Sequence, residues 1–183
     1  CAGQTIYQSN LCGARELPRI SPREALLGQV DLFRAFDATE RAELAAKMRC
    51  QELSAGETVM RQGDTGDHLY ALGEGILDVE IDRGSLAPIR DRLAPGEVFG
   101  EMSLLTGQPR SATVTAALDA VVYEVHRRDL DPILRRRPEL AEGLAAVMAA
   151  HQAHNKRLGS QPEQALPVAP GDLLTRLRLL FHL

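Results

Sequence analysis

The feature that most restricts the fold of this chain is its central stretch, residues 49–126, in which short apolar runs alternate with glycine-containing turns. Leu77, Val79 and Ile81 alternate there with acidic residues, which is the pattern of a half-buried strand. The glycine-containing turns lie at 55–57, 63–67, 73–75, 82–85 and 95–97. Turns that recur about every ten residues are typical of antiparallel β-sandwiches and barrels, and not of parallel sheets.

Helical patterns flank this stretch on both sides. Ser21-Pro22-Arg23-Glu24 forms a capping box with proline at the first helical position, and it predicts a helix running towards Phe33. Asp37 and Glu40 have the same capping-box spacing and predict the start of a second helix. After His126, helical spacing returns. We expect a leader or linker at 1–20, a domain at 21–158, a linker at 159–171 and a short amphipathic terminal helix at 172–183.

Composition narrows the classes of function. The 183 residues are 44% hydrophobic and 25% charged, as in soluble globular proteins, and only 4% aromatic, which predicts an aliphatic core. The net charge of −4 argues against a general nucleic-acid binder. Three cysteines without CxxC spacing indicate neither a disulfide framework nor a zinc knuckle. The first residue, Cys1, leads us to expect a piece of a longer protein.

The segment Phe99–Val114 carries the chemistry. Gly100 lets the backbone approach a ligand closely, since it has no Cβ. Glu101 only accepts hydrogen bonds and suits hydroxyl groups. Arg110 presents a planar set of donors that suits a phosphate. A compact nucleotide would satisfy all three.

This segment resembles the phosphate- and ribose-binding segment of the cyclic nucleotide-binding domain family. The resemblance covers about residues 28–150 and includes these further motifs: Asp31-Leu32-Phe33, Ala55-Gly56-Glu57, Arg61-Gln62-Gly63-Asp64, Leu69-Tyr70, Gly75 and Pro95-Gly96-Glu97. It implies an α+β fold, in which an eight-stranded antiparallel jelly roll is flanked by N-terminal helices and by C-terminal helices of B and C type.

The resemblance also implies roles for single residues. Gly100 and Glu101 would contact the ribose 2′-hydroxyl and the edge of the phosphate, Arg110 would pair with the cyclic phosphate, and Ser111 would add a hydroxyl and a backbone donor. Met102 and Ser103 would begin a short helix, Met102 to Leu105, whose N-terminus faces the phosphate. The last helix would close over the base as a lid, with Leu144, Val147 and Met148 as candidate lid residues.

Catalytic and metal sites are not expected. The histidines are scattered and form no HxH pair in the β region; they are His68, His126, His151, His154 and His182. No GxSxG, HExxH or Walker-type motif occurs. Asp64 and Asp67 lack the remaining ligands of an EF-hand. The sequence therefore predicts no enzyme, no catalytic residue and no metal.

The functional hypothesis is a regulatory domain that senses a cyclic nucleotide. Cyclic AMP is favoured, and cyclic GMP remains a candidate because Ser111 leaves the base preference open. Gln4–Gln8 resembles the tail of the cytoplasmic domain of the small-conductance mechanosensitive channel. We therefore expect the cytoplasmic ligand-gating module of a bacterial ion channel in the inner membrane, with a channel or other membrane domain on its N-terminal side and with homo-oligomers in the full-length protein. The alternatives are a stand-alone sensor that regulates a protein partner and a degenerate scaffold that binds no nucleotide.

Overall fold

The computed structural model describes residues 21–157 and 170–183, and the described residues contain two antiparallel four-stranded sheets. The strand orders are β1-β8-β3-β6 and β2-β7-β4-β5. The strands are β1 (Arg49–Leu53), β2 (Thr58–Met60), β3 (His68–Glu74), β4 (Leu77–Arg83), β5 (Leu86–Leu93), β6 (Val98–Phe99), β7 (Thr113–Ala116) and β8 (Ala120–His126). This architecture confirms the expected α+β jelly roll. The expected leader 1–20 and nearly all of the linker 159–171 lie outside the described residues.

The N-terminal helices begin where the capping signals place them. In α1 (Pro22–Gln29) and α2 (Ala38–Lys47), both halves of each capping box are formed, from Ser21 with Glu24 and from Asp37 with Glu40. The first helix does not continue to Phe33 as predicted. Gly28 lowers helical propensity and Val30 adopts an extended backbone, so the chain turns into a short 3₁₀ helix, η1 (Asp31–Phe33). This turn buries Phe33 completely.

Strand β4 has the half-buried pattern that its sequence predicts. Leu77 is fully buried and Ile81 is 8% exposed, whereas the acidic residues between them face solvent. On the solvent face, Asp78 and Glu80 form ion pairs with Arg92 and Arg90 of the neighbouring strand β5. Such exposed pairs contribute little, about 0.2–1 kcal/mol each. The burial of one face therefore fixes the register of this strand.

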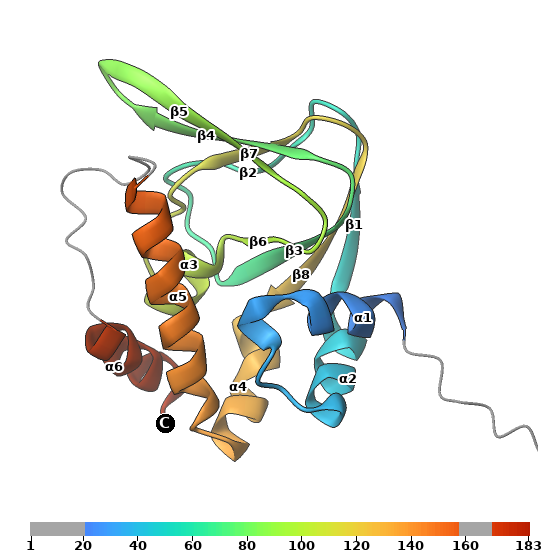
Figure 1. The fold of residues 1–183 in the computed structure, drawn as a ribbon, viewed down its shortest axis with the longest axis vertical. Coiled ribbons are helices and arrows are strands. Elements are labelled where there is room, and N and C mark those ends of the chain that lie inside the picture. Colours follow the sequence, from blue (N-terminus) through green and yellow to red (C-terminus); the bar gives the residue numbers. More distant parts are fainter. Residues whose placement is uncertain (1–20, 158–169) are drawn as a thin grey trace, which may run out of the picture.

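A second core lies below the roll, where the helices gather (Figure 1). The C-terminal part contributes α4 (Arg127–Arg136), α5 (Leu140–Arg157) and α6 (Pro170–Phe181). Helix α6 packs against α5, α3 and α4, and its Leu173, Leu177 and Phe181 have no exposed surface. The apolar face of this terminal helix is thus covered within the chain itself.

Candidate ligand-binding site

The site that the sequence singles out lies in a pocket of about 230 Å³ at the edge of the roll. Its apolar wall comes from β2, β4, β5, β6 and β7. Its polar lining comes from the start of helix α3 (Glu101–Thr106) and from three charged residues of β5 and of the turn before β6, Asp91, Arg92 and Glu97. The wall residues are Met60, Val79, Ile81, Ile89, Leu93, Val98, Phe99, Ala112 and Val114. The volume is slightly below the ~300 Å³ at which pockets for drug-sized ligands begin, so it fits a compact ligand.

The residues at the start of α3, which the sequence singles out as candidate ligand contacts, line this pocket. Gly100 caps the helix with a φ of 74°, a left-handed conformation that favours glycine. The next three residues, Glu101, Met102 and Ser103, also line the pocket. Glu101 is 6% exposed and Ser103 is 1% exposed, so the start of the helix is held firmly in place. Ser111 lines the pocket from the segment before β7 and is exposed.

Arg110 lies behind this wall and not in it. The side chain is 4% exposed, and its Nη1 donates hydrogen bonds to the carbonyl oxygens of His68 at 2.8 Å and Gly100 at 2.7 Å. The guanidinium carbon lies 5.8 Å from the centre of the Tyr70 ring, within the range of a cation–π contact. The guanidinium also lies close against Gly66, where an added Cβ would come within 2.4 Å of Nη2. Arg110 therefore ties the start of β3 to the start of α3.

The electrostatics of Arg110 suit an anion in the pocket. Burial lowers the pKa of Arg110, and the nearby Tyr70, Glu101 and Asp67 act in the opposite direction. A guanidinium stays protonated in proteins, so the charge persists at neutral pH. Arg110 donates a hydrogen bond to the carbonyl oxygen of Gly100, which itself lines the pocket, and a buried charge interacts strongly because water screens it little.

The three candidate lid residues do not line the pocket. Leu144 and Met148 are buried in the lower core with the N-terminal helices, and Val147 borders a separate shallow depression next to Asp31. In Figure 1, α5 begins next to α4 below the roll and extends upward along one side of it. The lid role of these residues stays a prediction.

Sequence reasoning missed most of the apolar wall. The alternating sequence of β4 indicates that Val79 and Ile81 point inward. The contribution of β5 could not be predicted, because that strand is largely exposed and its sequence is mostly polar. Tyr70 was noted only as part of a motif. In the structure its ring stacks on Phe99 with centroids 4.9 Å apart, directly before Gly100.

Among residues 21–157 and 170–183, no helix has both the length and the apolar character needed to cross a bilayer.

Comparison with known proteins agrees with this geometry. Residues 50–137 match the family model described as "Cyclic nucleotide-binding domain". A cyclic nucleotide-gated potassium channel of Mesorhizobium japonicum is 33% identical over 117 residues, which are 64% of this chain and 31% of the channel. The cAMP-dependent protein kinase regulatory subunit of Blastocladiella emersonii is 27% identical over 161 residues, or 84% of this chain and 40% of the subunit.

The solved structures include the regulatory domain of Toxoplasma gondii PKA in complex with cAMP. It aligns with a TM-score of 0.58 and 29% identity over 63% of this chain and 45% of that one. The chain thus spans between about a third and a half of the relatives it matches here. Fold, pocket and family model coincide on the same residues, and residues 50–137 match the cyclic nucleotide-binding domain family.

Proposed function

We propose that the chain binds cyclic AMP in the pocket at the start of α3 and regulates a protein or domain to which it is attached. The observation that carries the proposal is the arrangement around Gly100. Glu101 and Ser111 line the pocket beside it, and the buried guanidinium of Arg110 lies directly behind it. The cAMP complex of the Toxoplasma gondii regulatory domain supports this choice of ligand.

The polar groups of the site correspond to those of the ligand. A cyclic nucleotide carries one negative charge on its phosphate, and Arg110 is a buried cation next to the pocket. Glu101 would repel the phosphate, so it should accept a hydrogen bond from the ribose 2′-hydroxyl. The apolar wall from β4 and β5 offers the base a surface that excludes water.

Direct pairing between phosphate and Arg110 requires the guanidinium to turn from the carbonyl oxygens of His68 and Gly100 towards the pocket. Ligand binding would then loosen the link between β3 and α3. Since α6 and α3 are in contact, a shift of α3 would reach the C-terminal helices. We propose that this population shift carries the signal, because the ligand favours the state in which Arg110 faces it.

For the attached protein we propose a bacterial ion channel, with the potassium channel of Mesorhizobium japonicum as support. The coding sequence upstream of Cys1 tests this part. Apolar segments of about 20 residues are expected there, since that length spans a bilayer. If no such segment is present, the alternative of a sensor that regulates a protein partner replaces the channel, and its support is the likeness to kinase regulatory subunits.

Isothermal titration calorimetry tests ligand binding. We expect Arg110→Ala to weaken cyclic AMP binding at least tenfold, which corresponds to about 1.4 kcal/mol. Because Arg110 also joins two backbone segments, the fold of this variant is checked by circular dichroism, and Arg110→Lys keeps the charge without the planar donors. Unchanged affinity in Arg110→Ala removes this residue from the site.

A thermodynamic cycle that combines Glu101→Gln with removal of the 2′-hydroxyl from the ligand tests the role of Glu101. Glu101→Gln should weaken cyclic AMP binding about tenfold or more, the value of a hydrogen bond to a charged group, but should leave 2′-deoxy cyclic AMP binding almost unaffected. Equal losses for both ligands would contradict the contact with the 2′-hydroxyl. A tighter isotherm for cyclic GMP would overturn the preference for cyclic AMP, and no heat or thermal shift with either ligand would support the scaffold alternative.

A further inference from the structure

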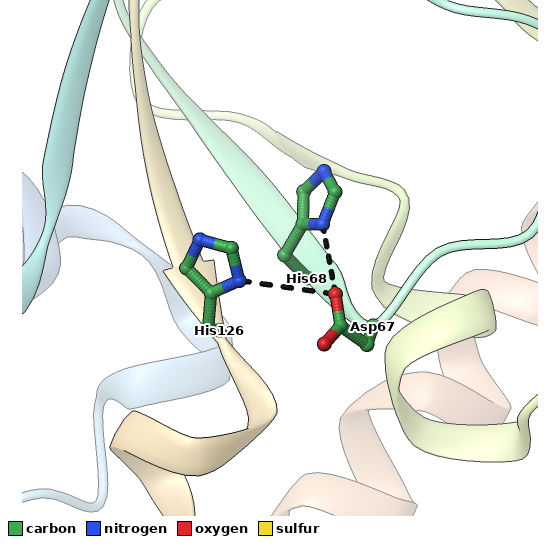
Figure 2. A group of neighbouring side chains, drawn as sticks. All are labelled: Asp67, His68 and His126. Atoms are coloured by element: carbon green, nitrogen blue, oxygen red, sulfur yellow. Dashed lines mark hydrogen bonds and ion pairs between the residues drawn. The ribbon is translucent and has the colours of Figure 1, made fainter.

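Three metal-binding side chains that are separate in the sequence meet at the beginning of β3. Asp67 precedes the strand, His68 begins it, and the antiparallel register places His68 opposite His126 at the end of β8. Figure 2 shows one carboxylate oxygen of Asp67 joined by dashed lines to a nitrogen of each imidazole ring. Its Oδ1 lies 3.2 Å from Nδ1 of His68 and 3.8 Å from Nδ1 of His126. One ligand atom from each residue lies within 4.8 Å of the other two.

The outer nitrogen of each ring is held by a second partner. Nε2 of His126 lies 3.2 Å from a carboxylate oxygen of Glu124, which only accepts hydrogen bonds when ionised. That nitrogen therefore carries the proton of the neutral ring, and Nδ1 presents a lone pair towards Asp67. Such an outer hydrogen bond to a carboxylate is the usual support of a metal-binding histidine.

His68 is supported in the same way. Its Nε2 lies 2.9 Å from the hydroxyl of Tyr70, and this hydroxyl donates to the carbonyl oxygen of Val59 at 3.5 Å. The hydroxyl can therefore accept from Nε2–H, which leaves the Nδ1 lone pair of His68 facing Asp67 as well. Three electron-pair donors thus converge, an arrangement that a cation satisfies.

The cluster is both fixed and accessible. The backbone oxygen of Asp67 accepts from the amide of Arg127 at 2.9 Å, and the backbone oxygen of His68 accepts from Arg110. The side chains of His68 and His126 are 22% and 14% exposed, whereas that of Asp67 is 71% exposed. The rings are therefore positioned by the sheet, and a hydrated ion can enter from the side of the carboxylate.

We propose that Asp67, His68 and His126 form a binding site for a divalent transition-metal ion of the Zn²⁺ type. Two imidazole nitrogens and one carboxylate oxygen are ligands that Zn²⁺, Co²⁺, Ni²⁺ and Cu²⁺ prefer, whereas Mg²⁺ and Ca²⁺ prefer oxygen. Bonds of about 2.0–2.2 Å to one ion place such ligand atoms roughly 3.3 Å apart, and the exposed Asp67 side chain can adjust to this spacing. Three protein ligands leave a coordination position for water.

The test uses the full chain freed of metal by a chelator. Zn²⁺ binding is measured by isothermal titration calorimetry, and Co²⁺ binding by its visible absorption, which reports the coordination geometry. A background variant that carries His151→Asn, His154→Asn and His182→Asn removes the three histidines outside the cluster. This background is expected to bind one Zn²⁺ per chain with unchanged affinity.

In this background, His68→Asn and His126→Asn should each weaken Zn²⁺ binding by more than tenfold. Glu124→Gln should weaken it by about tenfold, the usual effect of an outer partner. Asp67→Asn is the variant least able to disturb folding, because its side chain is largely exposed, and it should also lose more than tenfold. The proposal is overturned if the chain binds no Zn²⁺, if the three background substitutions abolish binding, or if Asp67→Asn leaves the affinity for Zn²⁺ unchanged.

Discussion

The two glycines that flank α3 offer a matched test of the position of Arg110. Gly100 and Gly107 have nearly the same left-handed backbone, with φ values of 74° and 72°. A Cβ at Gly100 would lie 2.3 Å from Nη1 of Arg110, whereas a Cβ at Gly107 would meet nothing within 4 Å. The substitutions Gly100→Ala and Gly107→Ala therefore cause the same backbone strain, and only the first displaces the guanidinium.

The magnitudes follow from this geometry. The left-handed conformation costs an alanine about 1–2 kcal/mol, partly offset by about 0.4–1 kcal/mol from the stiffer unfolded chain. Gly107→Ala should therefore lower the free energy of unfolding by about 1 kcal/mol. In Gly100→Ala, Nη1 must move by about 1 Å to reach an ordinary contact distance near 3.5 Å. That shift breaks or stretches its hydrogen bonds of 2.8 and 2.7 Å, which adds about 2–4 kcal/mol.

Urea denaturation measures the stability of both variants, and calorimetry measures their affinity for cyclic AMP. We expect at least a tenfold loss of affinity for Gly100→Ala and less than a threefold change for Gly107→Ala, since only the first places a Cβ against the guanidinium and so hinders its turn towards the pocket. If the two variants lose the same stability and bind cyclic AMP equally well, Arg110 is not held where the structure places it, and the reasoning fails.

Two further predictions concern stability. Phe181→Ala should destabilise the chain by about 3–5 kcal/mol, because the ring is completely buried in the lower core; Leu179→Ala, 71% exposed, serves as the control and should stay within about 0.5 kcal/mol in urea denaturation. Hydrogen bonds from Arg136 and Lys47 lower the pKa of Glu43 below its ordinary 4.5. Its contribution to stability is therefore present above that pH and is lost as the pH falls through the folded-state pKa. Glu43→Gln should flatten the decline of the melting temperature in acid, and an identical decline would contradict the ion pairs.

Local patterns predicted the local structure well. The capping boxes at Ser21 and Asp37 and the alternation in β4 each depend on residues a few positions apart, so their outcome can be derived from the sequence. The extent of α1 was wrong because tertiary burial of Phe33 overrides the helical pattern. The amphipathic pattern of α6 predicted a helix, but it could not identify the surface of α3 and α5 that covers it.

Contacts between residues that are far apart in the sequence could not be predicted. Arg110 was identified through its segment, but its hydrogen bond to the His68 carbonyl depends on how the loop before β3 folds. His68 and His126 read as scattered histidines, because only the register between β3 and β8 places them opposite each other. Strand register follows from the burial of whole faces, and no single motif encodes it.

The candidate phosphate-binding residue and the histidine cluster meet at one point of the fold, the beginning of β3. There the carbonyl oxygen of His68 accepts a hydrogen bond from Arg110 at 2.8 Å, while the imidazole of the same residue faces Asp67 at 3.2 Å. The negative charge of Asp67 also acts on the pKa of Arg110. A cation bound at the cluster would cancel this negative charge and add positive potential, and both effects favour an anion beside Gly100. Because coupling between two binding equilibria is reciprocal, a bound cyclic nucleotide would tighten the cation site by the same factor.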